Sequence, residues 1–432
     1  MKHPFTFSVA LVALISITTS LHAQTARLYD SGSGLPSTQI NDLFQGGNGM
    51  LWIATNNGLY RFDGLNFIGF HHDKEKENSL GSDLVLKVME DSHGVTWVGT
   101  STGLQVFDPD TNTFSDFTLD DSGRTHFIYG LEEVPLRHGQ SGILVSASNF
   151  GLYMLDAETH VLDDERRQRF TAPFGTDHLK TLFVDSKSRI WASSEMGGLL
   201  VYDSDSNVVL DGMWDGLPQD LREQIIATAF VEDETTEDIV IGTSNSGILV
   251  FDGKENRLCI PSDPASVNCK VMSLLESSRF SRLDGQTVIV GTENQGLKQF
   301  SLETRTLSDL SLPNVPFHTD KWKVHDLLED NQGNLWISAF QTGLMIVPQS
   351  MFGFRTNSFG SGDNPGENSS SLTSAYRDSE RGRTWVGSDG RGLFCLGNDG
   401  RTINYNSARR PSRGSTLRRY RGSGSERAVC TE

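Results

Sequence analysis

The sequence contains little cysteine and proline, and it lacks the short motifs of common catalytic and metal centres. It has four cysteines and 13 prolines in 432 residues, and no Cys-x-x-Cys pair or Cys/His cluster has the spacing of a zinc site. GxSxG, HExxH and the phosphate-binding P-loop are missing too. We therefore expect no metal, no cofactor and no local catalytic motif. A triad assembled from distant segments stays open, because its members need not be close in the chain.

Long apolar runs are also missing beyond the N-terminus. A transmembrane helix needs about 18 apolar residues, and no segment after residue 23 has them. The stretch from Phe5 to Ile17 is shorter, follows Lys2 and His3, and leads to Ala23. This order of charge, apolar run and small residue predicts a signal peptide over residues 1–23 and a periplasmic protein. An uncleaved anchor is the alternative.

Positive charge is scarce in the chain as a whole. Asp and Glu number 55 against 37 for Lys and Arg, a net charge of −18. Nucleic acid is therefore not expected as a partner, since its phosphates would be repelled. Hydrophobic residues make up only 36% and glycine is frequent at 43 residues. This composition favours many short strands joined by tight turns.

An internal repeat organises nearly the whole chain. In each copy an apolar segment is followed by an acidic turn, a strand, a turn that ends in glycine, and a second strand that often ends in Asp. The glycines recur every 45 to 49 residues, at positions 58, 103, 151, 198, 247, 296, 343 and 392. This period is typical of a four-stranded propeller blade. The shorter rungs of a parallel β-helix do not fit it.

A large apolar residue stands in the first strand of each glycine-joined pair. Five copies have tryptophan there: Trp52, Trp97, Trp191, Trp336 and Trp385. A blade cannot bury its own faces, so we expect these rings to be structural and to fill the space between blades. The segment Ala26–Tyr29 matches an orphan outer strand, and we expect it to close the ring with the seventh blade.

In propellers, ligands usually lie over the central channel, near the turns between second and third strands and the loops between blades. The polar residues expected there are candidates for binding a small polar ligand: Asn56, Asn57, His71, Thr102, Asn149, Glu195, Asn245, Glu293, Asn294 and Gln341. No catalytic residue is assigned. Separately, Cys259 and Cys269 lie ten positions apart and flank a loop, and in an oxidising compartment we expect them to form a disulfide.

The repeat resembles that of the two-component regulator propeller family. The resemblance rests on Asp330-x-x-Gly333-Asn334-Leu335-Trp336-Ile337-Ser338, on Trp97-Val98-Gly99-Thr100 and on Gly34-Leu35-Pro36. It implies a periplasmic sensor that often binds glycan fragments. It also implies two rings, followed by a membrane helix and an output module, which is a histidine kinase of a phosphorelay or a diguanylate cyclase.

The end of the chain departs from that pattern. From Arg401 to Glu432 there are eight arginines against two glutamates. We therefore expect an all-β chain with a seven-bladed propeller of four-stranded blades over residues 25–355. A single extra repeat that starts a second propeller covers 356–400, and a basic, disordered tail covers 401–432. The simplest interpretation is a truncated or frame-shifted gene product.

Three functions remain open. The first is the ligand-sensing module of a signalling receptor, non-enzymatic by itself, with an oligosaccharide as one possible ligand and an output domain or a second copy as partner. The second is a propeller enzyme, such as a lyase of the streptogramin-inactivating type. The third is a scaffold for protein contacts.

Overall fold

A computed structural model of the chain describes residues 26–119, 125–135, 141–148, 151–161, 179–203, 208–209, 212–218, 220–233, 235–277, 287–312, 315, 319–349, 372–378, 381, 383–388, 392–396, 402–405, 417–422 and 425–430. The predicted signal peptide lies outside them. The chain forms two compact units, Met1–Phe354 and Arg355–Glu432. Among the described residues, no helix is long and apolar enough to cross a membrane.

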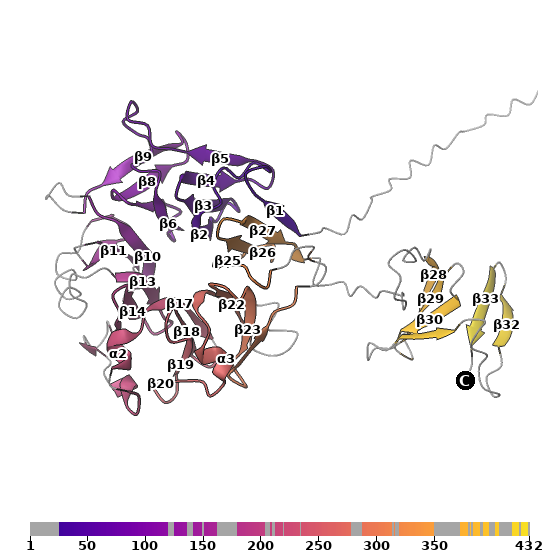
Figure 1. Cartoon of the computed structure of the whole chain (residues 1–432). Coiled ribbons are helices and arrows are strands. Elements are labelled where there is room, and N and C mark those ends of the chain that lie inside the picture. The colour runs from indigo at the N-terminus through magenta and orange to yellow at the C-terminus, as the bar shows by residue number, and fades with distance from the viewer. Residues whose placement is uncertain are drawn as a thin grey trace, which may run out of the picture. The chain divides into compact units, whose positions relative to one another are not determined.

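The first unit is built from antiparallel sheets that follow one another along the chain (Figure 1). Blade 1 contains β2 (Ile40–Gln45), β3 (Leu51–Thr55), β4 (Gly58–Phe62) and β5 (Phe67–Phe70). Blade 2 contains β6 (Val85–Glu90), β7 (Thr96–Thr100), β8 (Leu104–Asp108) and β9 (Thr113–Phe117). Blade 3 contains β10 (Ile128–Pro135), β11 (Ser141–Ala147) and β12 (Gly151–Asp156).

The next three sheets repeat the same order. Blade 4 contains β13 (Leu179–Val184), β14 (Arg189–Ser194), β15 (Leu199–Asp203) and β16 (Val208–Val209). Blade 5 contains β17 (Ala227–Asp233), β18 (Asp238–Thr243), β19 (Ile248–Asp252) and β20 (Arg257–Cys259). Blade 6 contains β21 (Val271–Glu276), β22 (Thr287–Thr292), β23 (Leu297–Ser301) and β24 (Thr306–Asp309). Loops between blades carry short helices: η2 (Gly212–Trp214), α2 (Leu221–Gln224) and α3 (Pro264–Val267).

Blade 7 joins the two ends of this unit. It contains β25 (Val324–Glu329), β26 (Leu335–Ala339) and β27 (Gly343–Val347). Its fourth strand is β1 (Arg27–Tyr29), whose Leu28 pairs with Met345. The innermost strand of every blade contacts that of the next, and β25 contacts β2. Within the described residues the first unit is thus a closed ring of seven sheets, and the N-terminal strand closes it.

The repeated glycine has the backbone conformation that the turn requires. All eight of these glycines have positive φ, from 66° at Gly296 to 159° at Gly103. Space is short as well, because a Cβ on Gly343 would lie 2.1 Å from the carbonyl oxygen of Tyr29 at the end of β1. Glycine accommodates both constraints because it has no side chain.

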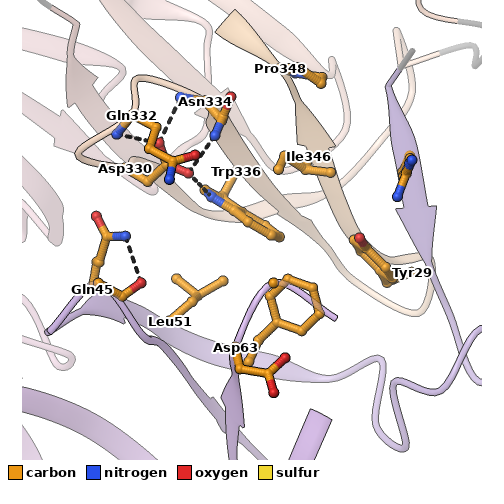
Figure 2. A pocket seen from close by; sticks show the side chains of 14 residues that line it. Tyr29, Gln45, Leu51, Asp63, Asp330, Gln332, Asn334, Trp336, Ile346 and Pro348 are labelled. Carbon is orange, nitrogen blue, oxygen red and sulfur yellow. Dashed lines mark hydrogen bonds between the residues drawn. The ribbon is translucent and has the colours of Figure 1, made fainter. Parts of the chain in front are cut away.

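The repeated tryptophan packs between blades and is held by the acidic turn. Trp97, Trp191 and Trp336 are at most 4% exposed. Each donates its indole N–H to the Asp six residues earlier, at 2.8 or 2.9 Å. Figure 2 shows this bond between Trp336 and Asp330. The same Asp carboxylate also accepts backbone N–H groups of its own turn. One side chain therefore fixes both the turn and the ring between two blades.

The cysteines differ from the prediction. Cys259 and Cys269 are both free thiols, so the structure does not contain the expected disulfide. Cys269 is buried among the apolar side chains of blades 5 and 6, and burial raises the pKa of its thiol to about 11. The Cys259 thiol instead lies 3.9 Å from the carbonyl oxygen of Arg257 in the same strand, β20.

The second unit holds one more sheet of the same kind. It contains β28 (Leu372–Asp378), β29 (Arg383–Ser388), β30 (Gly392–Leu396) and β31 (Thr402–Tyr405). A hairpin, β32 (Leu417–Gly422) with β33 (Ser425–Cys430), follows. The tail expected to be disordered from residue 401 thus contains strands here, and β31 completes the eighth repeat. Trp385 is only half-buried in this sheet.

Candidate functional site

The described residues among the predicted ligand-binding set lie at one end of the blades. Asn56, Asn57, Thr102, Glu195, Asn245, Glu293, Asn294 and Gln341 lie in turns between second and third strands, and His71 follows β5. Asn149 is outside the described residues. These turns face the same end of the ring as the first residues of the innermost strands, because β-strands alternate in direction within each blade. We call this end of the central channel the channel mouth.

Several of these residues are engaged in holding neighbouring segments together. The side chain of Asn56 donates to Gln39 at 2.7 Å and accepts from Asn41 at 2.8 Å. Asn245 accepts from the backbone N–H of Ile226 at 3.1 Å and donates to the carbonyl of Gln224. For these two amides the geometry supports a structural role in joining a turn to the next strand.

His71 also makes structural contacts, with a residue of its own blade and with the loop that follows it. Its Nε2 lies 3.4 Å from the hydroxyl of Tyr60, and its Nδ1 lies 3.5 Å from the carboxylate of Asp83. The imidazole also packs edge-on against the Tyr60 ring, with centroids 5.7 Å apart. Burial, followed by the charge of Asp83, raises the pKa of Tyr60. This arrangement anchors the loop after β5.

Glu195 and Glu293 are different, because each forms ion pairs with lysines that are not among the predicted site residues. Glu293 forms ion pairs with Lys270 at 3.2 Å and Lys323 at 3.4 Å. Glu195 pairs with Lys180 at 3.6 Å. We call Lys180, Lys270 and Lys323 the lysine rim. Their side chains are 59%, 63% and 33% exposed, so an incoming ligand has access to them.

An imidazole–phenyl stack lies beside the lysine rim. The rings of His325 and Phe340 are 5.3 Å apart and nearly parallel, at 17°. The Lys323 ammonium lies 5.2 Å from the same Phe340 ring. Burial, and then the charge of Lys323, lowers the pKa of His325, and Lys180 from blade 4 acts in the same direction. The charge of Lys180, in blade 4, therefore acts on His325 in blade 7.

Deeper in the channel wall, the innermost strands bury three carboxylates around one ammonium. Lys87 lies 2.5 Å from Asp42, and Asp42 accepts the backbone N–H of Val88 at 3.0 Å. Asp326 accepts the N–H of Leu43 from the neighbouring blade at 2.7 Å. Burial raises the pKa of Asp326 to about 7 and that of Glu132 to about 7. These bonds join blades 7, 1 and 2, so this layer is structural.

The lysine rim could have been found from the repeat. Lys270 and Lys323 directly precede β21 and β25, and Lys180 is the second residue of β13. Residues at the start of an innermost strand belong to the channel mouth in every blade. The predicted site residues come only from turns and interblade loops, so these lysines are not among them. In the part of the chain that the structure describes, no group of three or more His, Cys, Asp or Glu side chains is arranged to hold a metal.

Comparison with known proteins agrees with the repeat and the ring. The family described as two component regulator propeller matches residues 34–57, which include Gly34-Leu35-Pro36 and the first Trp strand. No curated protein matches the sequence.

Solved structures share the fold at low sequence identity. The extracellular domain assigned to the hybrid two-component system BT3049 of B. thetaiotaomicron superposes with a TM-score of 0.63 and 19% identity, over 88% of this chain and 49% of that one. The extracellular domain of BT4673 from the same organism, described as a one-component system, gives 0.55 and 18%, over 90% and 48%. The chain spans about half the length of these domains. The resemblance to the two-component regulator propellers is thereby confirmed at the level of repeat and fold.

Proposed function

We propose that this chain is the ligand-sensing propeller module of an exported signalling receptor, and that its ligand binds at the channel mouth. The observation that carries the proposal is the lysine rim, which places two exposed ammonium groups and a partly exposed one at the channel mouth of a chain whose net charge is −18. The confirmed resemblance to extracellular propellers of signalling systems supports the sensing role. By itself the module is expected to catalyse no reaction.

The chemistry of the mouth favours a polar ligand that carries an acidic group. Two glutamates offset part of the lysine charge, and the exposed Asn294 and Gln341 offer amides to hydroxyl groups. The Phe340 ring, stacked on His325, adds an apolar surface. An acidic oligosaccharide combines these features, since its carboxylates suit lysine and its hydroxyls suit amides and carboxylates. We therefore propose an acidic oligosaccharide as the ligand class.

A thermal-shift screen of acidic oligosaccharides, each paired with its carboxyl-reduced neutral counterpart, tests the proposal. A ligand present at about 100 times its Kd adds roughly 2.7 kcal/mol to stability, so the unfolding transition should rise by several degrees. Isothermal titration should then give an affinity at least tenfold weaker for the neutral counterpart. If no acidic or neutral saccharide of the panel binds, the proposed ligand class is wrong.

Variants of the lysine rim locate the site. Lys323→Met and Lys180→Met should each weaken binding about tenfold while leaving the unfolding transition nearly unchanged, because exposed ion pairs stabilise a fold little. Lys187→Met is the matched control, since Lys187 is also a paired, exposed lysine, 2.6 Å from Glu237, but lies in the turn at the other end of the blades. Equal losses in all three variants would contradict a site at the channel mouth.

A further inference from the structure

The interface between blades 4 and 5 contains a cation over its tryptophan. Arg189 donates through Nε to the Asp185 carboxylate, which also accepts the indole N–H of Trp191. Its guanidinium lies 5.7 Å from the Trp191 ring and 4.9 Å from the ring of Phe251 in blade 5. Carboxylate, two aromatic rings and a planar cation thus fill this end of the interface.

The interface between blades 2 and 3 uses a different residue for the same purpose. The imidazole of His160, from the turn after β12, packs edge-on against Trp97 with centroids 4.9 Å apart. Its Nε2 lies 3.9 Å from the carboxylate of Asp91, which is the indole acceptor of that blade. His160 is the fourth residue after β12, the third strand of blade 3, and it supplies the nitrogen-containing ring of this interface.

The interface between blades 1 and 2 is filled as well. The Arg61 guanidinium lies 5.6 Å from the Trp52 ring and 5.8 Å from the Phe107 ring. Arg61 also donates to Asn112 at 3.3 Å, and Asn112 holds the turn position in blade 2 that His160 holds in blade 3. In each of these three interfaces a planar nitrogen-containing side chain therefore lies against the repeated tryptophan, although a different residue supplies it each time.

The interface between blades 7 and 1 has the same walls but not this group. Trp336 and Asp330 are present and hydrogen-bonded, and Phe62 packs edge-on against Trp336 at 5.7 Å. Asn334 stands where blade 4 has Arg189, four residues after the Asp, and donates to Asp330 at 2.9 Å. The blade 1 turn is one residue shorter, because β5 starts four residues after Asp63, so no residue corresponds to His160.

A pocket of about 300 Å³ occupies this place. Figure 2 shows Asp330, Asn334 and Trp336 on the wall from blade 7, with Leu51 and Asp63 on the wall from blade 1. Arg27 also lines it. Of the described residues, no arginine, lysine or histidine lies over the Trp336 ring, whose aromatic neighbours are Tyr29 and Phe62. Because Asp330 and Lys323 flank opposite ends of β25, the pocket is far along the blade from the channel mouth.

We propose that this pocket binds a small organic cation whose guanidinium or primary ammonium group takes the position that Arg189 and His160 fill in the other interfaces. The cation would lie over the rings of Trp336 and Phe62 and between the carboxylates of Asp330 and Asp63, as Arg189 lies over Trp191 and Phe251. Cation–aromatic contacts strengthen when the cation is withdrawn from water, and Trp336, Phe62 and Asp330 are themselves buried. The site does not depend on the function proposed for the channel mouth.

The probe is butylguanidinium, and its uncharged isostere butylurea is the control ligand. Isothermal titration of the full chain should show binding of butylguanidinium at one site, with butylurea at least tenfold weaker. The affinity for butylammonium should lie between those for butylguanidinium and butylurea, since butylammonium keeps the charge and loses the planar shape. Equal affinity for butylurea, or no binding of either cation, would overturn the proposal.

One substitution should fill the pocket with a side chain of the protein itself. Asn334→Arg recreates the spacing of Asp185 and Arg189, so its guanidinium should occupy the pocket, abolish butylguanidinium binding and leave the unfolding temperature equal or higher. Asn78→Arg, at an exposed position in the loop after β5, adds the same charge elsewhere and should leave binding unchanged. Persisting binding in folded Asn334→Arg protein would place the ligand elsewhere and refute the site.

Two milder changes keep the test decisive if Asn334→Arg does not fold. Asp63→Asn removes an exposed carboxylate of the pocket and should weaken butylguanidinium binding about threefold or more. Arg27→Gln removes the like charge at the pocket and should strengthen binding by a similar factor. Opposite signs in these two variants support a cation between blades 7 and 1, and unchanged affinity in both would refute it.

Discussion

At the residue scale, the repeated tryptophan shows how one residue type acts differently in equivalent positions. Trp97, Trp191 and Trp336 each have an Asp as indole acceptor. Blade 1 has Gly46 at the acceptor position, and the indole nitrogen of the buried Trp52 has no hydrogen-bond partner among the described residues. A buried donor without an acceptor lowers stability by about 1–3 kcal/mol.

This difference predicts unequal effects of the same substitution. Trp97→Phe loses ring area and a hydrogen bond to Asp91, whereas Trp52→Phe loses similar ring area and removes an unpaired donor. We expect Trp97→Phe to lower the free energy of unfolding by about 1–3 kcal/mol more than Trp52→Phe does. Chemical denaturation of both variants measures it. Equal losses would show that the indole bond contributes nothing to stability.

The buried carboxylates of the channel wall predict a dependence of stability on pH. The folded pKa of Asp326 and that of Glu132 are both about 7, above their ordinary values of 3.8 and 4.5. The folded protein therefore binds these protons more tightly than the unfolded chain, and stability should fall as pH rises from about 4 to about 7. Urea unfolding midpoints at pH 5, 6, 7 and 8 measure the fall.

Two substitutions identify the groups responsible. Asp326→Asn should flatten the fall, because the asparagine no longer titrates yet its amide oxygen still accepts the N–H of Leu43. His325 has the opposite effect in part of this window, since its folded pKa is lowered and its contribution to stability grows with pH. His325→Gln should therefore steepen the fall. A slope unchanged by Asp326→Asn would exclude this carboxylate as its source.

At the scale of elements, β1 closes the ring by pairing with β27. Without β1 the third strand of blade 7 would become an exposed edge, and exposed edges pair with other chains. A chain that begins after Tyr29 should therefore unfold at a lower temperature than one that begins at Ala26, and it should associate as its concentration rises. Differential scanning calorimetry and sedimentation velocity test both effects. Identical behaviour of the two chains would show that β1 is dispensable.

Much of this element-level structure was predictable, because a repeat states the same pattern many times. The glycine spacing gave the turns, and Ala26–Tyr29 was identifiable as the missing fourth strand. The disulfide was predicted wrongly because sequence spacing does not show where thiols point, and Cys269 turns into the core. The pocket between blades 7 and 1 was not predictable, since it arises from a turn one residue shorter and from Asn334 in place of an arginine.

At the scale of the whole molecule, the sheet of the eighth repeat is less well buried than the blades of the first unit. Trp385 is half-buried, whereas Trp52, Trp97, Trp191 and Trp336 are at most 4% exposed. Tyr376 and Ile403 of the same sheet are 60% and 53% exposed. The apolar faces that pack between blades in the first unit are therefore only partly covered here, and this sheet should be much less stable than the ring.

This contrast predicts the outcome of limited digestion with trypsin. The boundary between the two units falls at Phe354 and Arg355, and Arg355 is itself a trypsin site. Because a weakly packed sheet opens more often than the ring, digestion should remove the second unit first and leave a fragment that ends at Arg355. Mass spectrometry identifies the fragment.

A recombinant chain ending at Phe354 should unfold within about 2 °C of the full chain, since a ring of seven blades buries its own faces. If residues beyond Leu372 resist trypsin as long as the ring does, the eighth sheet is packed against a partner surface. Its exposed Tyr376 and Ile403 would then mark where that partner binds.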